Sequence, residues 1–139
     1  MKNYNPKKVS VIVGTKAISG FTDGTFIKVS DDDDAFTKRT GVDGETTRSQ
    51  SNNYGGTITI TLDQASDSND YLSAMHALDR VAGSGIVPVL IRDALGKTLV
   101  AVESAWVKKR PDITFAKGSE DREWVLDCAS IDAVVGGNN

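Results

Sequence analysis

Short stretches of strictly alternating apolar and polar residues constrain this chain more than any other feature. The clearest is TITITL, residues 57–62, in which Ile58, Ile60 and Leu62 alternate with three threonines. A period of two places the aliphatic side chains on one face of a strand and the threonines on the other. Similar stretches, most of them separated by turn residues, occupy residues 7–14, 25–30, 87–93, 97–104, 105–110 and 123–132. Many short strands of this kind predict a mainly β fold, a sandwich or a barrel.

One pair of these stretches predicts a hairpin. Residues 87–93 and 97–104 flank the turn sequence DALGK. Asp93 followed by Gly96 suits a type I turn that ends in a left-handed glycine. We therefore expect residues 87–104 to form two neighbouring antiparallel strands.

Only residues 66–85 have the periodicity of a helix. Ser66 or Ser68 is suited to the N-cap, and Gly83 stands where a left-handed glycine commonly ends a helix. One apolar stripe recurs at helical spacing, and we expect it to pack against the sheets. Its residues are Tyr71, Leu72, Met75, Leu78 and Ala82.

Length and composition narrow the class of protein. A chain of 139 residues is expected to form a single domain, residues 1–139. The formal net charge of -3 argues against strong nucleic-acid binding, which depends on neutralising phosphates. The N-terminal sequence predicts no signal peptide, and no apolar run predicts a membrane span. We expect a protein that is made and folded in the cytoplasm.

The sequence contains no motif for catalysis, a cofactor or a metal. There is no phosphate-binding loop, no nucleophile elbow and no H-E-x-x-H sequence. His76 and Cys128 are the only residues of their kinds, and we interpret them as a helix-border histidine and a core cysteine. A single cysteine excludes an internal disulfide. We therefore expect neither an enzyme nor a protein with a bound cofactor.

Four consecutive aspartates open a long polar stretch, residues 31–54. The aspartates do not match a calcium-binding EF-hand loop, because Ala35 and Phe36 stand where an oxygen ligand and a glycine are needed. We interpret them as a solvated loop, with a looser calcium site as the lesser alternative. The only basic cluster, Lys108, Lys109 and Arg110, is too small to indicate nucleic-acid binding. A structureless segment as long as residues 31–54 is unusual in a compact domain unless it is functional.

Two blocks of sequence carry a resemblance to a known family. They are GVDGETTRSQSNNYGGTITITLDQASDSNDYLSAM, residues 41–75, and VPVLIRDALGKTLVAVESAWVKKRPDITFAKGSEDREWVLDCAS, residues 87–130. In this order and spacing the chain resembles tail tube proteins of contractile-tailed bacteriophages, from about residue 7 to residue 132. The resemblance implies two packed antiparallel sheets with one flanking helix. The same fold is shared by type VI secretion and bacteriocin tube proteins.

The resemblance also implies an assembly. Six copies would form a ring, and rings would stack into the inner tube of the tail. Strands of all six copies would join into one β-barrel around a channel that conducts the genome. The expected partners are further copies of the chain and the sheath, tape-measure, baseplate and tail-terminator proteins. DNA would pass without specific binding, and no membrane is involved. The protein would be located in the virion tail after assembly in the host cytoplasm.

Within that assembly the residues give specific expectations. Thr57, Thr59 and Thr61 are expected to face the channel because they alternate with the core aliphatics, and Glu45, Thr47 and Ser49 are weaker candidates for the same lining. Residues 31–54 are expected to form an extended loop or hairpin that reaches another subunit. Residues 134–139 are expected to be flexible or to order on a neighbour. Ring stacking is expected to pair two clusters of opposite charge, Asp31, Asp32, Asp33 and Asp34 with Lys108, Lys109 and Arg110.

Two other functions remain open at this point. The tube of a phage-like bacteriocin or of a secretion system needs the same ring, so the sequence does not separate it from a phage tail. A small-ligand-binding β-sandwich needs a pocket with convergent polar groups, and the sequence identifies no residues for one.

Overall fold

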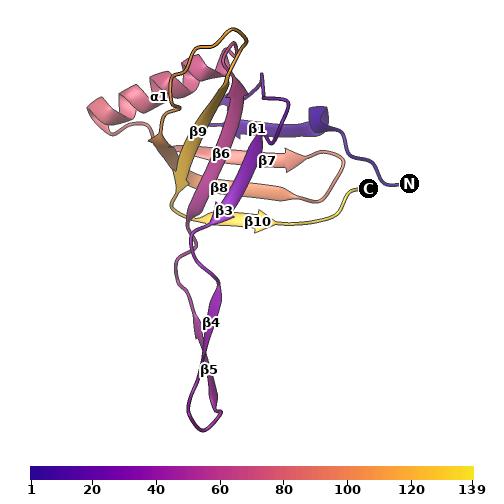
Figure 1. Ribbon diagram of the computed structural model, residues 1–139, viewed down its shortest axis with the longest axis vertical. Helices are drawn as coiled ribbons and strands as arrows, with labels where there is room; N and C mark the ends of the chain where they lie inside the picture. The colour runs from indigo at the N-terminus through magenta and orange to yellow at the C-terminus, as the bar shows by residue number, and fades with distance from the viewer.

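The computed structural model describes residues 1–139, and it confirms a mainly β protein with two packed antiparallel layers and one α-helix (Figure 1). A short 3-10 helix, η1, opens the chain. In order, the elements are η1 (Pro6–Lys8), β1 (Val9–Val13), β2 (Lys16–Ala17), β3 (Ile27–Asp31), β4 (Phe36–Thr40), β5 (Thr46–Gln50), β6 (Gly56–Asp63), α1 (Ser68–Ala82), β7 (Val87–Asp93), β8 (Leu99–Lys109), β9 (Asp121–Cys128) and β10 (Ile131–Val134).

Strand β8 belongs to both layers and joins them into one hydrogen-bonded sheet. Its first half pairs with β7 on one side and with β10 on the other. Its second half, from Ala105, pairs with β9. The pairing shifts register between Val87 and Val89 and again between Val107 and Lys109. Such bulges bend a strand, which allows β8 to pass from one layer to the other.

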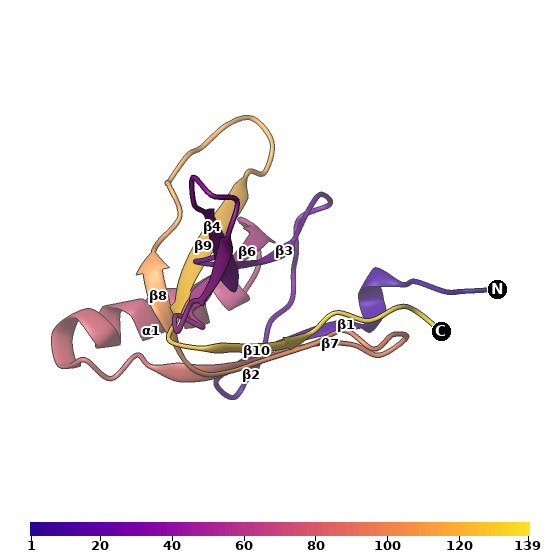
Figure 2. The ribbon, with the colours of Figure 1, turned by 90° about the horizontal axis from the view of Figure 1, so that it is seen from below.

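We call the two layers the wall and the cross layer. The wall consists of the second half of β8, then β9, β6 and β3, all antiparallel. The cross layer consists of β2, β1, β7, the first half of β8, and β10. In Figure 1 the strands of the wall run steeply across those of the cross layer, and Figure 2 shows the two layers from below.

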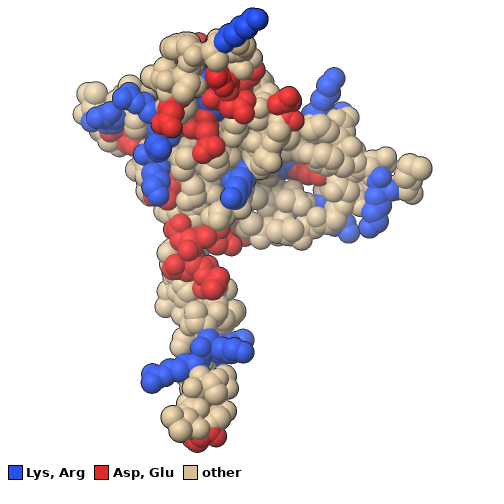
Figure 3. All heavy atoms as spheres, viewed as in Figure 1, with Lys and Arg blue, Asp and Glu red and all other residues tan.

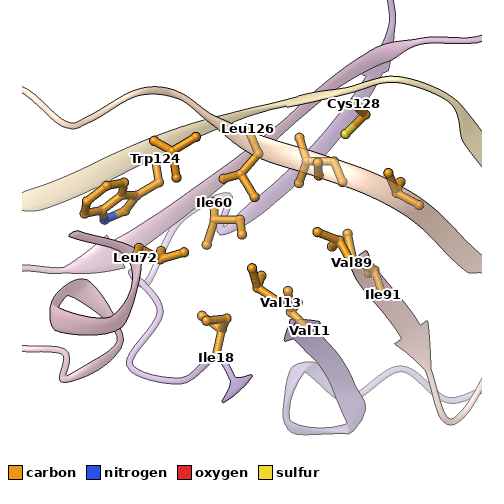
Figure 4. Close-up of a cluster of buried hydrophobic side chains, with 14 of the residues drawn as sticks. Val11, Val13, Ile18, Ile60, Leu72, Val89, Ile91, Trp124, Leu126 and Cys128 are labelled. Carbon is orange, nitrogen blue, oxygen red and sulfur yellow. The ribbon is translucent and has the colours of Figure 1, made fainter. Parts of the chain in front are cut away.

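The core lies between the two layers (Figure 4). Alternation decides which residues enter it, because every second residue of a strand points to the same face. Ile58, Ile60 and Leu62 of β6 are completely buried, as the TITITL pattern predicts. Leu126 and Trp124 of β9 lie beside them, and Val11, Val13, Val89, Ile91, Val100 and Val102 come from the cross layer.

The first half of α1 is fixed to the wall. The Ser66 hydroxyl accepts a hydrogen bond from the Ser68 amide (3.2 Å), and the Trp124 indole donates to the Asn69 side chain (2.9 Å). Leu72 and Met75 are buried, and Gly83 ends the helix with a φ of 66°. The expected stripe was too long, however, because its last two members are exposed. Figure 1 shows why: the second half of the helix extends past the edge of the sheets.

The β7–β8 hairpin is confirmed, but its turn differs from the expected one. Gly96 has no positive φ, so the turn is not closed by a left-handed glycine. Instead the C-terminal residues pack against it, and Asn138 forms a bridge with Gly96 and donates to the Asp93 carboxylate (2.9 Å). A Cβ on Gly96 would lie 3.2 Å from the Gly137 carbonyl oxygen. Glycine is therefore needed here for close approach of the C-terminal segment.

Residues 32–55 leave the domain as an arm, which is the hairpin β4–β5 with its two connections. It continues the direction of β3 and β6 away from the domain (Figure 1). All residues of β4 and β5 are exposed, so the arm contributes nothing to the core. The polar sequence 31–54 forms regular structure without burial in its own chain.

Candidate assembly surfaces

The outward face of the wall is polar and carries charges of both signs. Thr57, Thr59 and Thr61 are on this face, opposite the buried aliphatics of the same strand. Their cross-strand partners are Ser30 and Lys28 of β3 and Asp127, Val125 and Glu123 of β9. The orientation follows from alternation, and the sequence predicts it. A face of this kind is suited to water rather than to a dry contact.

The wall has two free edges. β3 pairs with β6 on one side only, and the second half of β8 pairs with β9 but diverges from β7 after Ala105. Because the wall has four antiparallel strands, its two edge strands run in opposite directions. The half-buried Trp106 lies beside the free edge of β8 and pairs with Asp127. Free edges carry unpaired backbone groups that readily pair with another chain.

The arm presents two different faces. Cross-strand pairing places Phe36, Lys38 and Arg48 on one face, and Arg39, Thr47 and their neighbours on the other. The Arg48 guanidinium lies over the Phe36 ring, 4.2 Å from its centre. The candidates Thr47 and Ser49 share the second face, whereas Glu45 lies in the turn at the tip. Glu45 closes the hairpin, because its carbonyl accepts from the Gly41 amide (2.8 Å).

Charges alternate along the arm (Figure 3). The four aspartates at its base, which we call the collar, are Asp31, Asp32, Asp33 and Asp34. The basic band lies beyond them and consists of Lys38, Arg39 and Arg48. Asp43 and Glu45 make the tip acidic again. The Asn53 amide donates to the Asp33 carboxylate (3.0 Å), and the aspartates do not gather with other ligands into a metal-binding cluster.

The structure does not bring Lys108, Lys109 and Arg110 to the collar of the same chain. Asp31 pairs with Gly56 at one end of β6, whereas Lys109 pairs with Val125, which is level with Thr59. Beyond it the chain continues toward the other end of the wall. A contact between the collar and this basic cluster would have to join two different chains.

Cys128 and His76 form no pair. Cys128 is 4% exposed at the end of β9, and burial, together with the charges of Asp127 and Asp32, raises the pKa of its thiol to about 11. His76 is half-buried on α1, and its Nδ1 atom has no hydrogen-bond partner. A thiol with a raised pKa is protonated and a poor nucleophile at neutral pH.

The outer face of the cross layer carries an open groove of about 680 Å³. Ile12, Leu90 and Ala101 are among its apolar lining residues, and Glu103 and Asp132 supply carboxylates. An apolar lining with a few polar groups is what a small-ligand site needs, so this groove is the candidate site for the β-sandwich alternative. In addition, α1 is too short and too polar to qualify as a membrane-spanning helix.

Sequence reasoning missed the free edges, Trp106 and the charge bands. The edges depend on which strands pair, and that is a long-range property. The sequence of residues 31–48 contains the alternating charges, but only the hairpin register shows that Lys38 and Arg48 lie opposite one another.

The chain is similar to phage and contractile-injection proteins. A family described as "Bacteriophage PhiTE tail tube protein" matches residues 9–136. "Structural protein ORF10" of Pseudomonas phage KPP10 is 31% identical, over 97% of this chain and 83% of that protein. Two solved structures share the fold at low identity. The tube-terminating cap of the anti-feeding prophage has a TM-score of 0.66 and 9% identity, and covers 97% of this chain and 93% of its own. The sheath/tube terminator of the PVC extracellular contractile injection system has a TM-score of 0.63 and 12% identity, with 97% and 99% covered.

Proposed function

This chain belongs to the bacteriophage PhiTE tail tube protein family, and from that premise we propose that its copies form hexameric rings that stack into the inner tube of a contractile phage tail. The protein is a structural component of a phage tail and not an enzyme. The single observation that carries the proposal is the wall, which has one polar face, one core face and two free antiparallel edges.

The edges support closure into a ring. When β3 of one copy lies beside the second half of β8 of the next, the two strands are antiparallel, as at every other position of the wall. This holds for any number of copies, because the wall has an even number of strands. The joined walls form one continuous barrel, and closure removes the exposed edges. The number six comes from the family and not from this geometry.

The polar face of the wall supports a channel for DNA. In the closed barrel it lines the lumen, so that Thr57, Thr59 and Thr61 face the passing genome. Lys28 and Glu123 flank these threonines with opposite charges. A lining with no excess of positive charge releases few counterions from DNA and therefore does not hold it. Thr47 and Ser49 extend the lining only if the second face of the arm turns toward the axis.

The ends of the wall supply the stacking surfaces. The collar and the arm lie at one end of the wall, whereas Lys109 lies midway along it, level with Thr59, so a contact between the collar and Lys108, Lys109 and Arg110 would join two successive rings. The cross layer is then on the outside of the tube. Its groove faces the sheath, and the tape-measure, baseplate and tail-terminator proteins meet the tube inside and at its two ends. The assembled protein is located in the virion tail.

A second candidate is the tube of an extracellular injection system or bacteriocin. It is favoured by the shared fold with the PVC terminator, which covers 97% of this chain. The same ring geometry serves both functions, so the two differ in what the channel carries.

Electron microscopy of the purified protein tests the proposal. We expect rings and tubes with an open channel, and sixfold symmetry in end views. Tubes purified with their particles distinguish the two candidates, because only a phage tail is attached to a DNA-filled head. A uniform monomer that binds a small molecule in the groove would instead support the β-sandwich alternative.

A further inference from the structure

Neither β4 nor β5 contains an acidic residue that could pair with the basic band. Lys38 and Arg48 lie directly opposite one another in β4 and β5. Like charges in this position destabilise a hairpin, and a two-stranded hairpin without a core is marginal in any case. Phe36, on the same face, is 46% exposed. This face of the arm is therefore built for an acidic partner that its own chain does not bring to it.

The spacing of charges along the arm matches the length of the wall. β6 spans eight residues, which is about 26 Å at roughly 3.3 Å per residue. Asp31 is level with the first residue of β6, and Lys38 follows it seven residues further along the arm, about 23 Å at most, because the chain bends at residues 32, 33 and 35. If the walls of two copies stand end to end, the arm of one runs along the wall of the next. Its basic band then reaches the level of the second copy's collar.

Contacts within one ring do not satisfy the band. Neighbouring arms of a ring are at the same height, so band would face band and collar would face collar. Repulsion between like charges disfavours that arrangement. Contact between successive rings places charges of opposite sign at the same level.

We infer that the arm of each copy docks along the next copy in the stack and places Lys38 and Arg48, which share one face of the arm, on the acidic collar Asp31–Asp34 of that copy. Arg39 lies at the same level on the other face and adds to the positive charge there. The inference rests on the proposed tube, and it deepens it by naming the surface on which each arm lies. The collar is then not a cation site but the receptor for the next arm, and Lys108–Arg110 are not its main partner.

A pair of charge-reversed variants tests this contact. The band variant carries Lys38→Glu, Arg39→Glu and Arg48→Glu, and the collar variant carries Asp32→Lys, Asp33→Lys and Asp34→Lys. We expect neither to form tubes alone at a concentration at which the wild type polymerises. Mixed in equal amounts they should form tubes, because each glutamate band then meets a lysine collar and each native band meets a native collar.

The controls keep the inference falsifiable. The variant Lys7→Glu, Lys8→Glu and Lys16→Glu has the same charge change outside the arm and should polymerise. Should a reversed variant misfold, as judged by circular dichroism, the milder Lys38→Gln, Arg39→Gln and Arg48→Gln variant should form tubes whose salt sensitivity is lower than that of the wild type.

Two results would overturn the inference while leaving the tube intact. One is normal polymerisation of either reversed variant alone. The other is recovery of the collar variant by a Lys108→Glu, Lys109→Glu, Arg110→Glu partner but not by the band variant. A wild type that forms no rings would overturn the proposed function and this contact with it.

Discussion

Gly56 stands where three segments of the wall converge. It lies opposite Asp31 of β3 and opposite Cys128 of β9, and a Cβ there would collide with the Ser30 carbonyl oxygen and the Ile131 side chain. Backbone atoms cannot move aside cheaply, so we expect Gly56→Ala to lower the free energy of unfolding by about 1–3 kcal/mol. Urea unfolding measures this. Gly24→Ala is the matched control, because a Cβ there meets nothing within 4 Å, and an equal loss in both variants would contradict the steric explanation.

Cys128 gives the wall a dependence on alkaline pH. The folded pKa of about 11 lies above the ordinary value of 9.0, chiefly because burial disfavours the thiolate. An acid whose pKa is raised by folding contributes its full stability below the unfolded pKa, and loses it as the unfolded state ionises. We expect stability to fall between pH 9 and pH 11, and to fall less in Cys128→Ala. Parallel pH–melting curves of the two proteins compare this directly, and identical slopes would exclude Cys128 as the source.

For single residues, alternation predicts which strand side chains are buried, but helical spacing does not predict where the burial of a helix ends. The three aliphatics of TITITL are buried as predicted, because the side-chain period of a strand is fixed by its backbone. Leu78 fits the helical stripe equally well, yet it is 52% exposed. The helix extends past the edge of the sheets there. Helical periodicity shows which side of a helix is apolar, but it does not show how far the sheet that the helix packs against extends.

The hairpin β4–β5 of the arm packs against nothing in its own domain. We expect deletion of residues 35–52, with a short glycine linker in their place, to leave the unfolding free energy within about 1 kcal/mol of the wild type, since the Tyr54 carbonyl still accepts from the Ile131 amide and only loop closure changes. Tube formation should be lost. Thermal unfolding and electron microscopy of the same sample measure both quantities. Tubes formed by the deletion variant would remove the arm from the assembly.

Trp106 reports on the free edge of β8. It is half-buried in the single chain, and a neighbouring β3 would cover it when the walls join. We therefore expect the tryptophan emission to shift to shorter wavelength on assembly. Trp124 is 4% exposed and should contribute a constant background, which a Trp106→Phe variant isolates. An unchanged spectrum in assembled wild-type tubes would place the seam elsewhere.

The strands could be predicted from the sequence, but their division into two layers could not. Each alternating stretch lies in strand structure because the signal is local, but stretches 97–104 and 105–110 are parts of one strand, β8, and stretch 123–132 is divided between β9 and β10. The passage of β8 from the cross layer to the wall depends on register shifts near Val89 and Val107. Those shifts arise from pairing with residues far away in the chain, and nothing in residues 99–109 alone marks them.

The two ends of the wall differ, and its two edges are unpaired in a single chain. One end of the wall carries the arm and collar, the opposite edges of the wall are unpaired, and one of its faces is wet. In the proposed tube the lateral contact uses the backbone of β3 and β8, and the axial contact uses charged side chains, most of them on the arm. The two kinds of contact can therefore be weakened separately, and rings without tubes are the expected product when only the axial contact is lost.

The proposed channel lining is the feature of the assembly that a charge change tests most directly. Replacing Thr57, Thr59 and Thr61 with lysine adds three positive charges to each copy on a face that is polar and not part of the core, so the fold should be retained. Tubes of this variant should hold DNA, and raising the salt concentration should release it, since each neutralised phosphate frees counterions. In the wild type Lys28 lies opposite Thr59 and the oppositely charged Glu123 lies opposite Thr61, so wild-type tubes should bind DNA weakly. Retention is measured by co-sedimentation of short duplex DNA with assembled tubes over a salt series. A triple variant that binds no more DNA than the wild type, while forming normal tubes, would place the threonines away from the lumen and would reverse the orientation of the wall.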